Sequence, residues 1–569
     1  MRPPTPASLI FTRSLFGLVL GLVLPGLAPS LYAQVDDETG VKLFRLATTN
    51  LYGNGIRVAQ AEAEASTNPP AFEVSPANAG APAGIFTYQS ALGASSSYPN
   101  SVGTNSGHAE RVAQFLYGTV SPGDTPGGIA TNLAHVDVID ANYFINNYVY
   151  LSLIGQVNLG DPLINQSFSF ADTVAGNPSS TNFQEAIDMA YDNYAAQFNV
   201  LFFSSAGTTG TPAAPGTAYN SISVASYNGP DNAGGNSATG PTVDNGRCKP
   251  EISAPDQNTS FAIPQVTGAA AVLMQAGLRG DGGRNTNAAV DIRTLKALLL
   301  NGAVKQSDWT NGPNAPLDAR FGAGMLNLYN SYRLLAAGQQ TNAVSVSVTT
   351  GTAHPPTGAT NTIPGLYGWN FATNTSSSTA DAIHHYYFNV TNSGAAAFLT
   401  TATLVWNRHI NSKFATIAYP YTVAPNIIGI NNLRLYLYNT ANSNLVTCST
   451  SLVNNVQHFY VPALAPGRYD LQVWKAGGSG TISTAEPYAL AFAFVPRPVL
   501  TMGRDGTNVT VTWPAFPAGF LAQAVTNFTA SPAWSTNGLL GFAVTNQQIV
   551  LPLPPTNRAR FFRLNSPNF

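Results

Sequence analysis

The sequence predicts an α/β domain, with a parallel sheet covered by helices on both faces, followed by two all-β, sandwich-like domains. Short apolar runs alternate with helical patterns over residues 40–338, after which helical periodicity disappears. Alternation of period two replaces it over 341–496, and a second small β unit follows over 497–569. A chain of 569 residues is also long enough for three domains.

The first region consists of short apolar strand patterns separated by helical ones. Such alternation predicts parallel strands, because each crossover helix packs back on the sheet that it connects. The Gly-Gln-Gln-Thr-Asn stretch at 338–342 is the expected linker to the next domain. We expect strands at residues 56–59, 136–139, 200–203 and 221–225, and helices at 185–191 and 293–300.

The region beyond the linker shows polar and apolar residues in alternation, with turns such as Ala-Pro-Gly-Arg at 465–468 between the strands. This pattern is typical of a β-sandwich. The clearest expected strands are residues 433–438, 457–461, 469–473 and, in the last unit, 509–513.

The composition excludes some classes of partner. Charged residues are 9% of the chain, against about 25% in an average soluble protein. The net charge of −2 gives no basis for a nucleic-acid or anionic-membrane partner. Two cysteines, Cys248 and Cys448, are too few for a disulfide framework. One interdomain bridge and two unpaired buried thiols both fit the sequence.

The N-terminus indicates export. Arg2 and Arg13 precede the apolar run at 15–24, and a small residue, Ala33, lies at the expected cleavage point. We therefore expect residues 1–33 to be a cleaved signal peptide. Pro25 and Pro29 interrupt the apolar stretch short of the roughly 20 residues that a membrane anchor needs. We expect a mature protein that is soluble and secreted, either extracellular or at the cell surface, without a membrane span.

A serine lies at the head of the most informative segment, Asn-Thr-Ser-Phe-Ala-Ile-Pro-Gln-Val-Thr-Gly at 258–268, which small and apolar residues follow. A helix that is apolar on all sides must be buried, so it holds Ser260 at one fixed place. Its first-turn N–H groups favour negative charge there, which suits an acyl-transfer nucleophile. The alternative is that Thr259 and Ser260 only cap the helix.

This segment resembles the Gly-Thr-Ser-x-Ala-x-Pro-x-Val-x-Gly signature of subtilisin-like serine peptidases, with Asn258 in place of the leading Gly. The Lys-Pro-Glu-Ile-Ser-Ala-Pro stretch at 249–255 is similar to the family's approach strand. The resemblance implies a subtilisin-like sheet and a serine endopeptidase acting on proteins or peptides. It also implies an acid and a histidine before Ser260, in the order acid, His, Ser.

His108 fits the histidine of that set. It opens a helical pattern similar to the family's His-Gly-Thr-His-Val-Ala, in which Ala109 and Arg111 replace the Gly and the second His. The other histidine of residues 40–338, His135, precedes a strand and is interpreted as structural.

Glu62 takes the place of the family's Asp. The segment at 53–62 resembles the strand Gly-x-Gly-Val-x-Val-Ala-Val-Ile-Asp, and counting along it puts Glu62 at the acid position. A glutamate can accept the His N–H, fix the tautomer and stabilise the imidazolium, provided that its extra methylene is absorbed. Glu64 is the second candidate, and a pair of solvated glutamates is the alternative.

The oxyanion donor is also changed. Residues 203–210 resemble the family's Ala-Ala-Gly-Asn-x-Gly turn, with Thr208 in the Asn position, and the N–H of Ser260 is the second donor. Losing one donor costs about 3–4 kcal/mol of transition-state stabilisation, but a threonine hydroxyl still donates one hydrogen bond. We therefore expect a slower enzyme rather than an inactive one.

The substrate edge is the least defined part. Ser167, Phe168 and Ser169 replace the family's edge segment, which binds the substrate backbone as an added strand. Phe168 and Phe170 either narrow the cleft or belong to the core. No metal-ligand cluster is legible and no cofactor is implied, while structural calcium, common in this family, is left open. Because only a short stretch separates Ala33 from the first catalytic strand, we expect no inhibitory prodomain between them.

Residues 341–496 resemble the β-sandwich that often follows the peptidase domain in secreted bacterial subtilases, and the last unit resembles small β modules of secreted bacterial proteins. Their role is open between polymer binding, cell-surface retention and packing. The sequence thus predicts a secreted serine endopeptidase with Ser260, His108 and Glu62. The alternative is a catalytically degenerate surface or binding protein on the same scaffold.

Overall fold

The computed structural model describes most of the chain, and the predicted signal peptide lies outside the described residues. Those residues are 39–120, 127–149, 155–170, 180–227, 236–350, 362–391, 394–411, 427–505, 508–527, 532–536, 539, 542–553 and 560–565.

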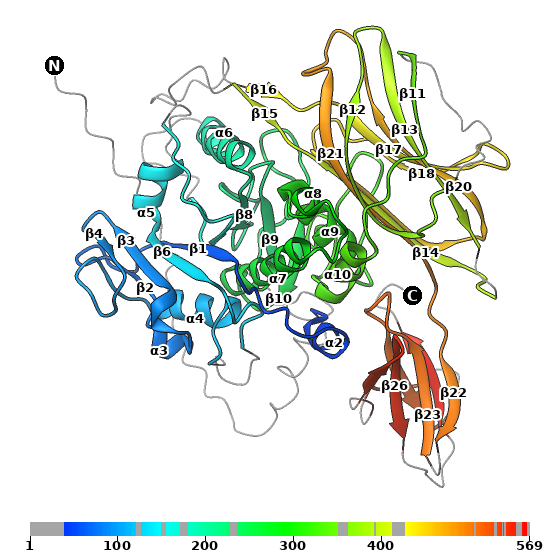
Figure 1. Cartoon of the computed structure of the whole chain (residues 1–569), viewed down its shortest axis with the longest axis horizontal. Helices are drawn as coiled ribbons and strands as arrows, with labels where there is room; N and C mark the ends of the chain where they lie inside the picture. The colour runs from blue at the N-terminus through cyan, green and yellow to red at the C-terminus, as the bar shows by residue number, and fades with distance from the viewer. Residues whose placement is uncertain are drawn as a thin grey trace.

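The first part of the chain is an α/β fold around an eight-stranded sheet (Figure 1). All neighbouring strands run parallel except the last pair, β3 and β4. The strand order is β10-β9-β8-β7-β1-β6-β3-β4. The predicted subtilisin-like parallel sheet is confirmed. Its strands are β1 (Arg57–Glu62), β3 (Phe86–Ser90), β4 (Gly93–Ser95), β6 (His135–Asp140), β7 (Leu163–Gln166), β8 (Leu201–Ser205), β9 (Ile222–Tyr227) and β10 (Ile252–Pro255).

Helices and short elements surround this sheet. The α-helices are α2 (Val41–Ala47), α3 (Pro76–Ala79), α4 (Gly107–Leu116), α5 (Ala141–Phe144), α6 (Ser180–Phe198), α7 (Thr259–Arg279), α8 (Thr286–Ala289), α9 (Ile292–Gly302) and α10 (Leu328–Ala336). Short helical turns η1 (Ala83–Ile85) and η2 (Ile145–Val149) and a small pair, β2 (Ala71–Glu73) and β5 (Thr104–Asn105), complete it.

Helix α7 is the central helix of this region. By length and composition alone it is apolar enough to cross a membrane, but 89% of its apolar window is buried inside the protein. It packs against β7, β8, β9 and β10, and small residues such as Gly268 let it approach the Leu116 carbonyl at the end of α4. Burial on all sides fixes both the direction of α7 and the place where it begins.

The second part is a β-sandwich of two antiparallel sheets. Its core contains inward-facing leucines, aromatics and Trp406. One sheet holds β11 (Val344–Thr349), β13 (Ala380–Val390), β20 (Gly467–Lys475), β17 (Leu433–Asn439) and β18 (Leu445–Ser449). The other sheet holds β12 (Tyr367–Thr375), β21 (Ala485–Pro496), β14 (Phe398–Trp406) and β19 (Val456–Leu464). The strands β15 (His409–Ile410) and β16 (Ile427–Gly429) form a separate two-stranded sheet.

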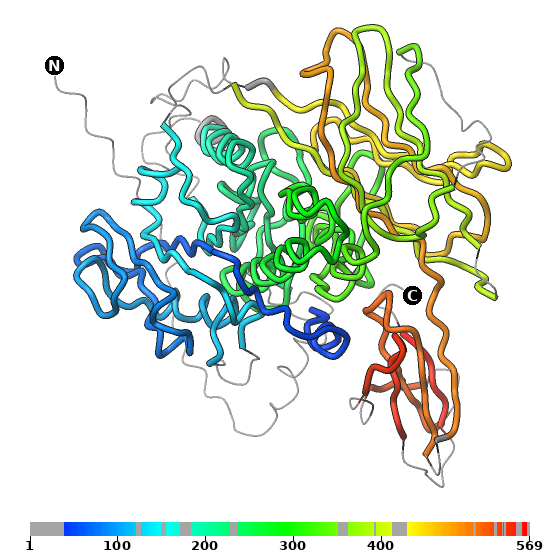
Figure 2. Tube along the Cα trace, in the orientation of Figure 1, coloured from blue at the N-terminus to red at the C-terminus, as the bar shows by residue number. Residues whose placement is uncertain are grey.

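The C-terminal part is a small all-β unit, as predicted. The chain passes from the α/β region into the sandwich and then into this unit, as the trace in Figure 2 shows. A four-stranded sheet holds β22 (Thr501–Asp505), β23 (Asn508–Pro514), β26 (Gln548–Leu553) and β25 (Ala543–Thr545), and a second pair holds β24 (Leu521–Val525) and β27 (Phe561–Asn565).

The α/β region and the sandwich share a packed interface. Helix α9 lies against β14 and β21, and Trp369 of β12 donates its indole N–H to the Leu335 carbonyl at 3.1 Å. Because the two regions pack closely, these contacts do not mark where one domain ends, and the domain boundaries near residues 340 and 496 stay predictions. Cys248 is buried and Cys448 half-buried, and both are free thiols, so the interdomain bridge is not formed.

Candidate active site

Ser260 is the second residue of α7 and lies at the surface end of this buried helix. The N-cap is Asn258, which makes no side-chain capping bond. The Thr259 hydroxyl instead bonds to that of Ser205 at 2.8 Å, at the end of β8. The interpretation of Thr259 and Ser260 as mere caps is therefore wrong. Ser260 is half-buried, and its N–H belongs to the first turn, which has no intrahelical acceptor.

A proline inside α7 explains how Ser260 is attached to the sheet. In a regular helix the N–H at position 264 would bond to the Ser260 carbonyl, but Pro264 has none. The Ser167 hydroxyl takes its place and donates to the Ser260 carbonyl at 2.8 Å. The Ser260 hydroxyl in turn faces the Ser167 carbonyl at 3.4 Å. Pro264 thus frees an acceptor that ties the serine to the end of β7.

His108 and Glu62 form a hydrogen-bonded pair. Nδ1 of His108 lies 2.8 Å from Oε2 of Glu62. Glu62 is the last residue of β1 and its side chain is 1% exposed, whereas the imidazole of His108, in the first turn of α4, is 32% exposed. The Ser106 hydroxyl accepts the N–H of Ala109 at 3.3 Å and caps α4. The sheet and the helix together bring this predicted pair into contact.

The predicted site omitted Gln60, which holds the second oxygen of Glu62, and Tyr117, which holds Gln60. Gln60 donates to Oε1 of Glu62 at 2.8 Å and to the Ala109 carbonyl at 2.9 Å. The buried hydroxyl of Tyr117 donates to the Gln60 amide oxygen at 2.7 Å. Gln60 precedes Glu62 by two residues, so the period of a strand puts both side chains on one face. That spacing was a signal that could have found Gln60.

Opposing effects set the pKa of His108. Burial disfavours the imidazolium, but attraction to Glu62 and the hydrogen bond to it outweigh burial and raise the pKa above 6.5. Phe261, the residue after Ser260, packs against the imidazole with ring centroids 5.7 Å apart. The Arg111 guanidinium lies 4.6 Å from the centre of the Phe261 ring. Phe261 therefore contacts two residues of α4, His108 and Arg111.

The second candidates lie elsewhere. Glu64 is beyond the end of β1, and Asn142 approaches it at 3.4 Å. His135 begins β6 and lies 3.3 Å from Asp137 and 3.2 Å from the Thr87 hydroxyl. Glu62 is therefore the acid that contacts His108, and the solvated-glutamate interpretation does not hold for Glu62.

Thr208 lies in the turn that follows β8, and its side chain is exposed. The turn itself is well anchored: the N–H of Gly207 bonds to the Ser205 hydroxyl at 3.0 Å, and Gly207 has φ +107°, a conformation that favours glycine. Ser205 also contacts Thr259, so the turn and the start of α7 are joined. The turn that carries Thr208 is thus joined, through Ser205, to the residue before Ser260, and the role of Thr208 as oxyanion donor stays a prediction.

The predicted substrate edge divides into two parts. Ser167 contacts Ser260, and Ser169 is half-buried. The side chains of Phe168 and Phe170 are 7% and 5% exposed, pack on each other with centroids 6.1 Å apart, and belong to the core. Of the two interpretations left open, the core position holds, so the Phe168 side chain does not line a cleft. In the described part of the chain, no group of three or more His, Cys, Asp or Glu residues could hold a metal ion.

Comparison with known proteins gives one family match. Residues 87–324 match the peptidase S8 family, described as the subtilase family. The match includes His108, Thr208 and Ser260, and it begins after Glu62. Subtilases are serine peptidases, so the match supports a serine peptidase. No curated protein matches the chain.

Solved structures give distant similarities. The crystal structure of MycP1 without its N-terminal propeptide is 17% identical and covers 52% of this chain and 96% of its own, with a TM-score of 0.31. The psychrophilic subtilisin-like protease Apa1 from the Antarctic psychrotroph Pseudoalteromonas sp. AS-11 is 12% identical and covers 52% and 97%, with a TM-score of 0.31. The subtilase family model matches residues 87–324, which include the serine motif, and all-β sheets follow this region.

Proposed function

We propose that the protein is a serine endopeptidase in which Ser260 is the nucleophile, His108 the general base and Glu62 the acid that orients His108. The observation that carries the proposal is the 2.8 Å contact between His108 and Glu62, with the imidazole packed against Phe261, the residue after Ser260. Gln60 occupies the other oxygen of Glu62, so the carboxylate has one free direction, toward His108.

In this mechanism His108 takes the proton of the Ser260 hydroxyl as its oxygen attacks the scissile carbonyl. The imidazolium, stabilised by Glu62, then gives that proton to the leaving amine, and an acyl-enzyme remains on Ser260. Water, deprotonated by His108, hydrolyses the acyl-enzyme and restores the serine. The Ser260 N–H and the Thr208 hydroxyl are the proposed oxyanion donors. The substrate backbone would add to the end of β7 near Ser167 and Ser169.

Export is part of the proposal, on the sequence pattern of residues 1–33. N-terminal sequencing of the mature protein tests it, with Gln34 as the expected first residue. The same proposal gives the C-terminal β units a role in holding a polymer or the cell surface. Pull-down of the mature protein and of a chain that ends at residue 496 on the same polymers tests the role of the last unit.

A binding protein on a degenerate peptidase scaffold is the second candidate, and the exposed threonine in the oxyanion position favours it. A fluorophosphonate probe separates the two candidates, because it labels only an activated serine. We expect labelling of the wild type and its loss in Ser260→Ala, with Ser345→Ala, at an exposed serine of β11, as a labelled control. Folded wild-type protein that takes up no probe at Ser260 would refute the enzyme.

A further inference from the structure

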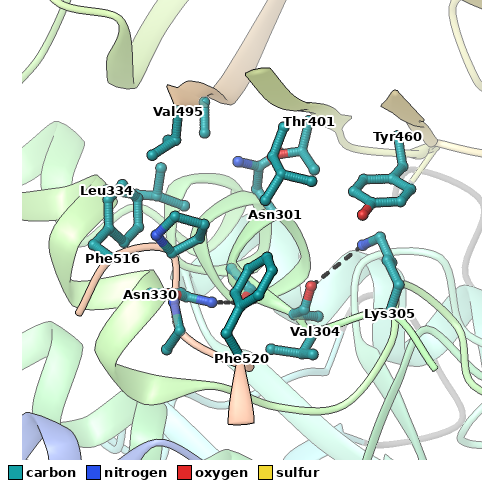
Figure 3. A pocket seen from close by; sticks show the side chains of 16 residues that line it. Asn301, Val304, Lys305, Asn330, Leu334, Thr401, Tyr460, Val495, Phe516 and Phe520 are labelled. Carbon is teal, nitrogen blue, oxygen red and sulfur yellow. Dashed lines mark hydrogen bonds between the residues drawn. The ribbon is translucent and has the colours of Figure 1, made fainter. Parts of the chain in front are cut away.

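A cavity lies where the three parts of the chain meet (Figure 3). The hollow is partly open and spans about 570 Å³, a volume that includes open solvent. The end of α9 and helix α10 form one wall, strands of the sandwich a second, and the segment before β24 a third. Apolar side chains make up most of the lining: Leu334, Leu399, Val495, Phe516 and Phe520.

Lys305 is the unusual member of this lining. It is 4% exposed, and its amine donates to the carbonyls of Ala323 and Ala303. Among the described residues no carboxylate forms an ion pair with it. The other two fully buried lysines of this region differ, since Lys249 and Lys296 share Glu251 at 3.0 and 2.7 Å.

Burial without a counter-charge has a chemical consequence. It lowers the pKa of Lys305 to about 7, because the low dielectric disfavours the ammonium. An unpaired buried charge is costly, whereas a paired one is tolerated. An anion delivered into the cavity would therefore give Lys305 the partner that Glu251 gives to the other two lysines.

Asn301 supplies a second donor. It is 4% exposed, its amide oxygen accepts the Thr403 hydroxyl at 3.0 Å, and its amide Nδ2 is buried with no hydrogen-bond partner. Asn330, also in the lining, is occupied, since it donates to the Gly302 carbonyl and accepts the N–H of Ala518. The Asn301 Nδ2 is thus an unfilled donor, and the Lys305 amine, 5.0 and 5.8 Å from the ring centres of Trp309 and Tyr460, has aromatic but no anionic neighbours among the described residues. A ligand for this site has to bring acceptors.

We propose that this cavity binds a small monocarboxylate with an apolar body, such as a six-carbon fatty acid. The carboxylate lies between the Lys305 amine and the Asn301 amide, and the hydrocarbon lies against Leu334, Val495 and Phe520. No bond is made or broken. The amine takes up or keeps one proton, and the ion pair forms in a water-poor site. Because each wall belongs to a different part of the chain, the bound ligand holds the three parts together.

Titration calorimetry of the full mature chain with hexanoate and with 1-hexanol tests this site. The two probes share an apolar body, and only the first carries the acceptors. We expect hexanoate to bind at least tenfold more tightly than 1-hexanol. In Lys305→Met, which keeps the side-chain volume and removes the charge, we expect hexanoate to lose at least tenfold in affinity and 1-hexanol to be unchanged.

Two further variants complete the experiment. Asn301→Leu should weaken hexanoate less than Lys305→Met does, and Val495→Trp, which fills the cavity, should weaken both probes. Thermal unfolding shows whether each variant is folded, and Lys305→Met should be at least as stable as the wild type because no buried charge is left unpaired. Hexanoate that does not bind, that binds no better than 1-hexanol, or that binds Lys305→Met undiminished would overturn the proposal.

Discussion

The two sides of Ser260 are held in different ways. On the acid side, the substituted residue is fully integrated: Glu62 is buried, contacts His108 through one oxygen and Gln60 through the other. On the oxyanion side, the turn is anchored by Ser205 but the substituted side chain, Thr208, is exposed. Glu62, which is longer than the family's Asp, is held by hydrogen bonds to His108 and Gln60. Thr208 is shorter than the family's Asn, so its hydroxyl reaches less far toward an oxyanion. The expected cost of the two substitutions is therefore unequal.

The largest expected effect tests the acid side. In Glu62→Gln the charge that stabilises the imidazolium is lost, and we expect kcat on a peptide substrate to fall by about 10⁴-fold. Glu64→Gln is the matched control and should change kcat by no more than about twofold, since Glu64 is half-buried beyond the end of β1 and no contact joins it to His108 or Ser260. Equal losses in the two variants would contradict the assignment of the acid.

On the oxyanion side, a substitution is expected to raise kcat rather than lower it. Thr208→Asn restores the longer amide donor, and we expect kcat to rise by about tenfold, a part of the 10²–10³ that one donor is worth. Thr208→Val has nearly the volume of threonine but no hydroxyl, and kcat should fall below that of the wild type. If Thr208→Asn and Thr208→Val both leave kcat unchanged, position 208 does not stabilise the oxyanion.

The network around Glu62 gives a smaller effect. Gln60→Leu removes the donor to Oε1 and leaves the Tyr117 hydroxyl without its acceptor, so Glu62 can turn away from His108. We expect kcat to fall by about tenfold to a hundredfold, as for a misplacement of about 1 Å, and stability to fall by about 1–3 kcal/mol. Tyr117→Phe removes one hydroxyl and should have a weaker effect on both. An unchanged kcat in a folded Gln60→Leu protein would show that Glu62 needs no support.

The pH dependence of kcat/KM reports the same contact. The reactive form of His108 is neutral, so activity rises as the pH rises through its pKa. The rising limb of the wild type should have its midpoint above 6.5. Glu62→Gln removes the negative charge that raises the pKa of His108 and weakens the hydrogen bond, while burial, which lowers that pKa, stays, so the midpoint should move below that of the wild type. A midpoint that does not move, measured on the residual activity, would show that Glu62 does not set the charge of His108.

Much of the site followed from the sequence because its residues lie in short, local patterns. The serine motif, the helix that begins near His108 and the strand that ends at Glu62 each carry their own signal. The order of the three along the chain then joined them. The choice of Glu62 over Glu64 rested on counting along a strand, and the end of β1 agrees with it.

Other features needed contacts between residues far apart in the chain. Tyr117 reaches Gln60 across 57 positions, and Ser167 reaches Ser260 across 93. The core position of Phe168 could not be separated from a cleft position, since a large apolar residue just after a strand is expected in both. No local pattern distinguishes Lys305, which has no carboxylate partner in the described chain, from Lys249 and Lys296, which have one.

The sequence alone determined the α/β and all-β classes and predicted Ser260, His108 and Glu62 as the candidate site, because periodicity and motif spacing depend on neighbours along the chain. The tertiary structure decided how these residues are supported. Packing brought Gln60 to Glu62, left Thr208 exposed and enclosed Lys305 between three walls. Burial and hydrogen-bond partners depend on which surfaces meet, and that information is absent from any single segment.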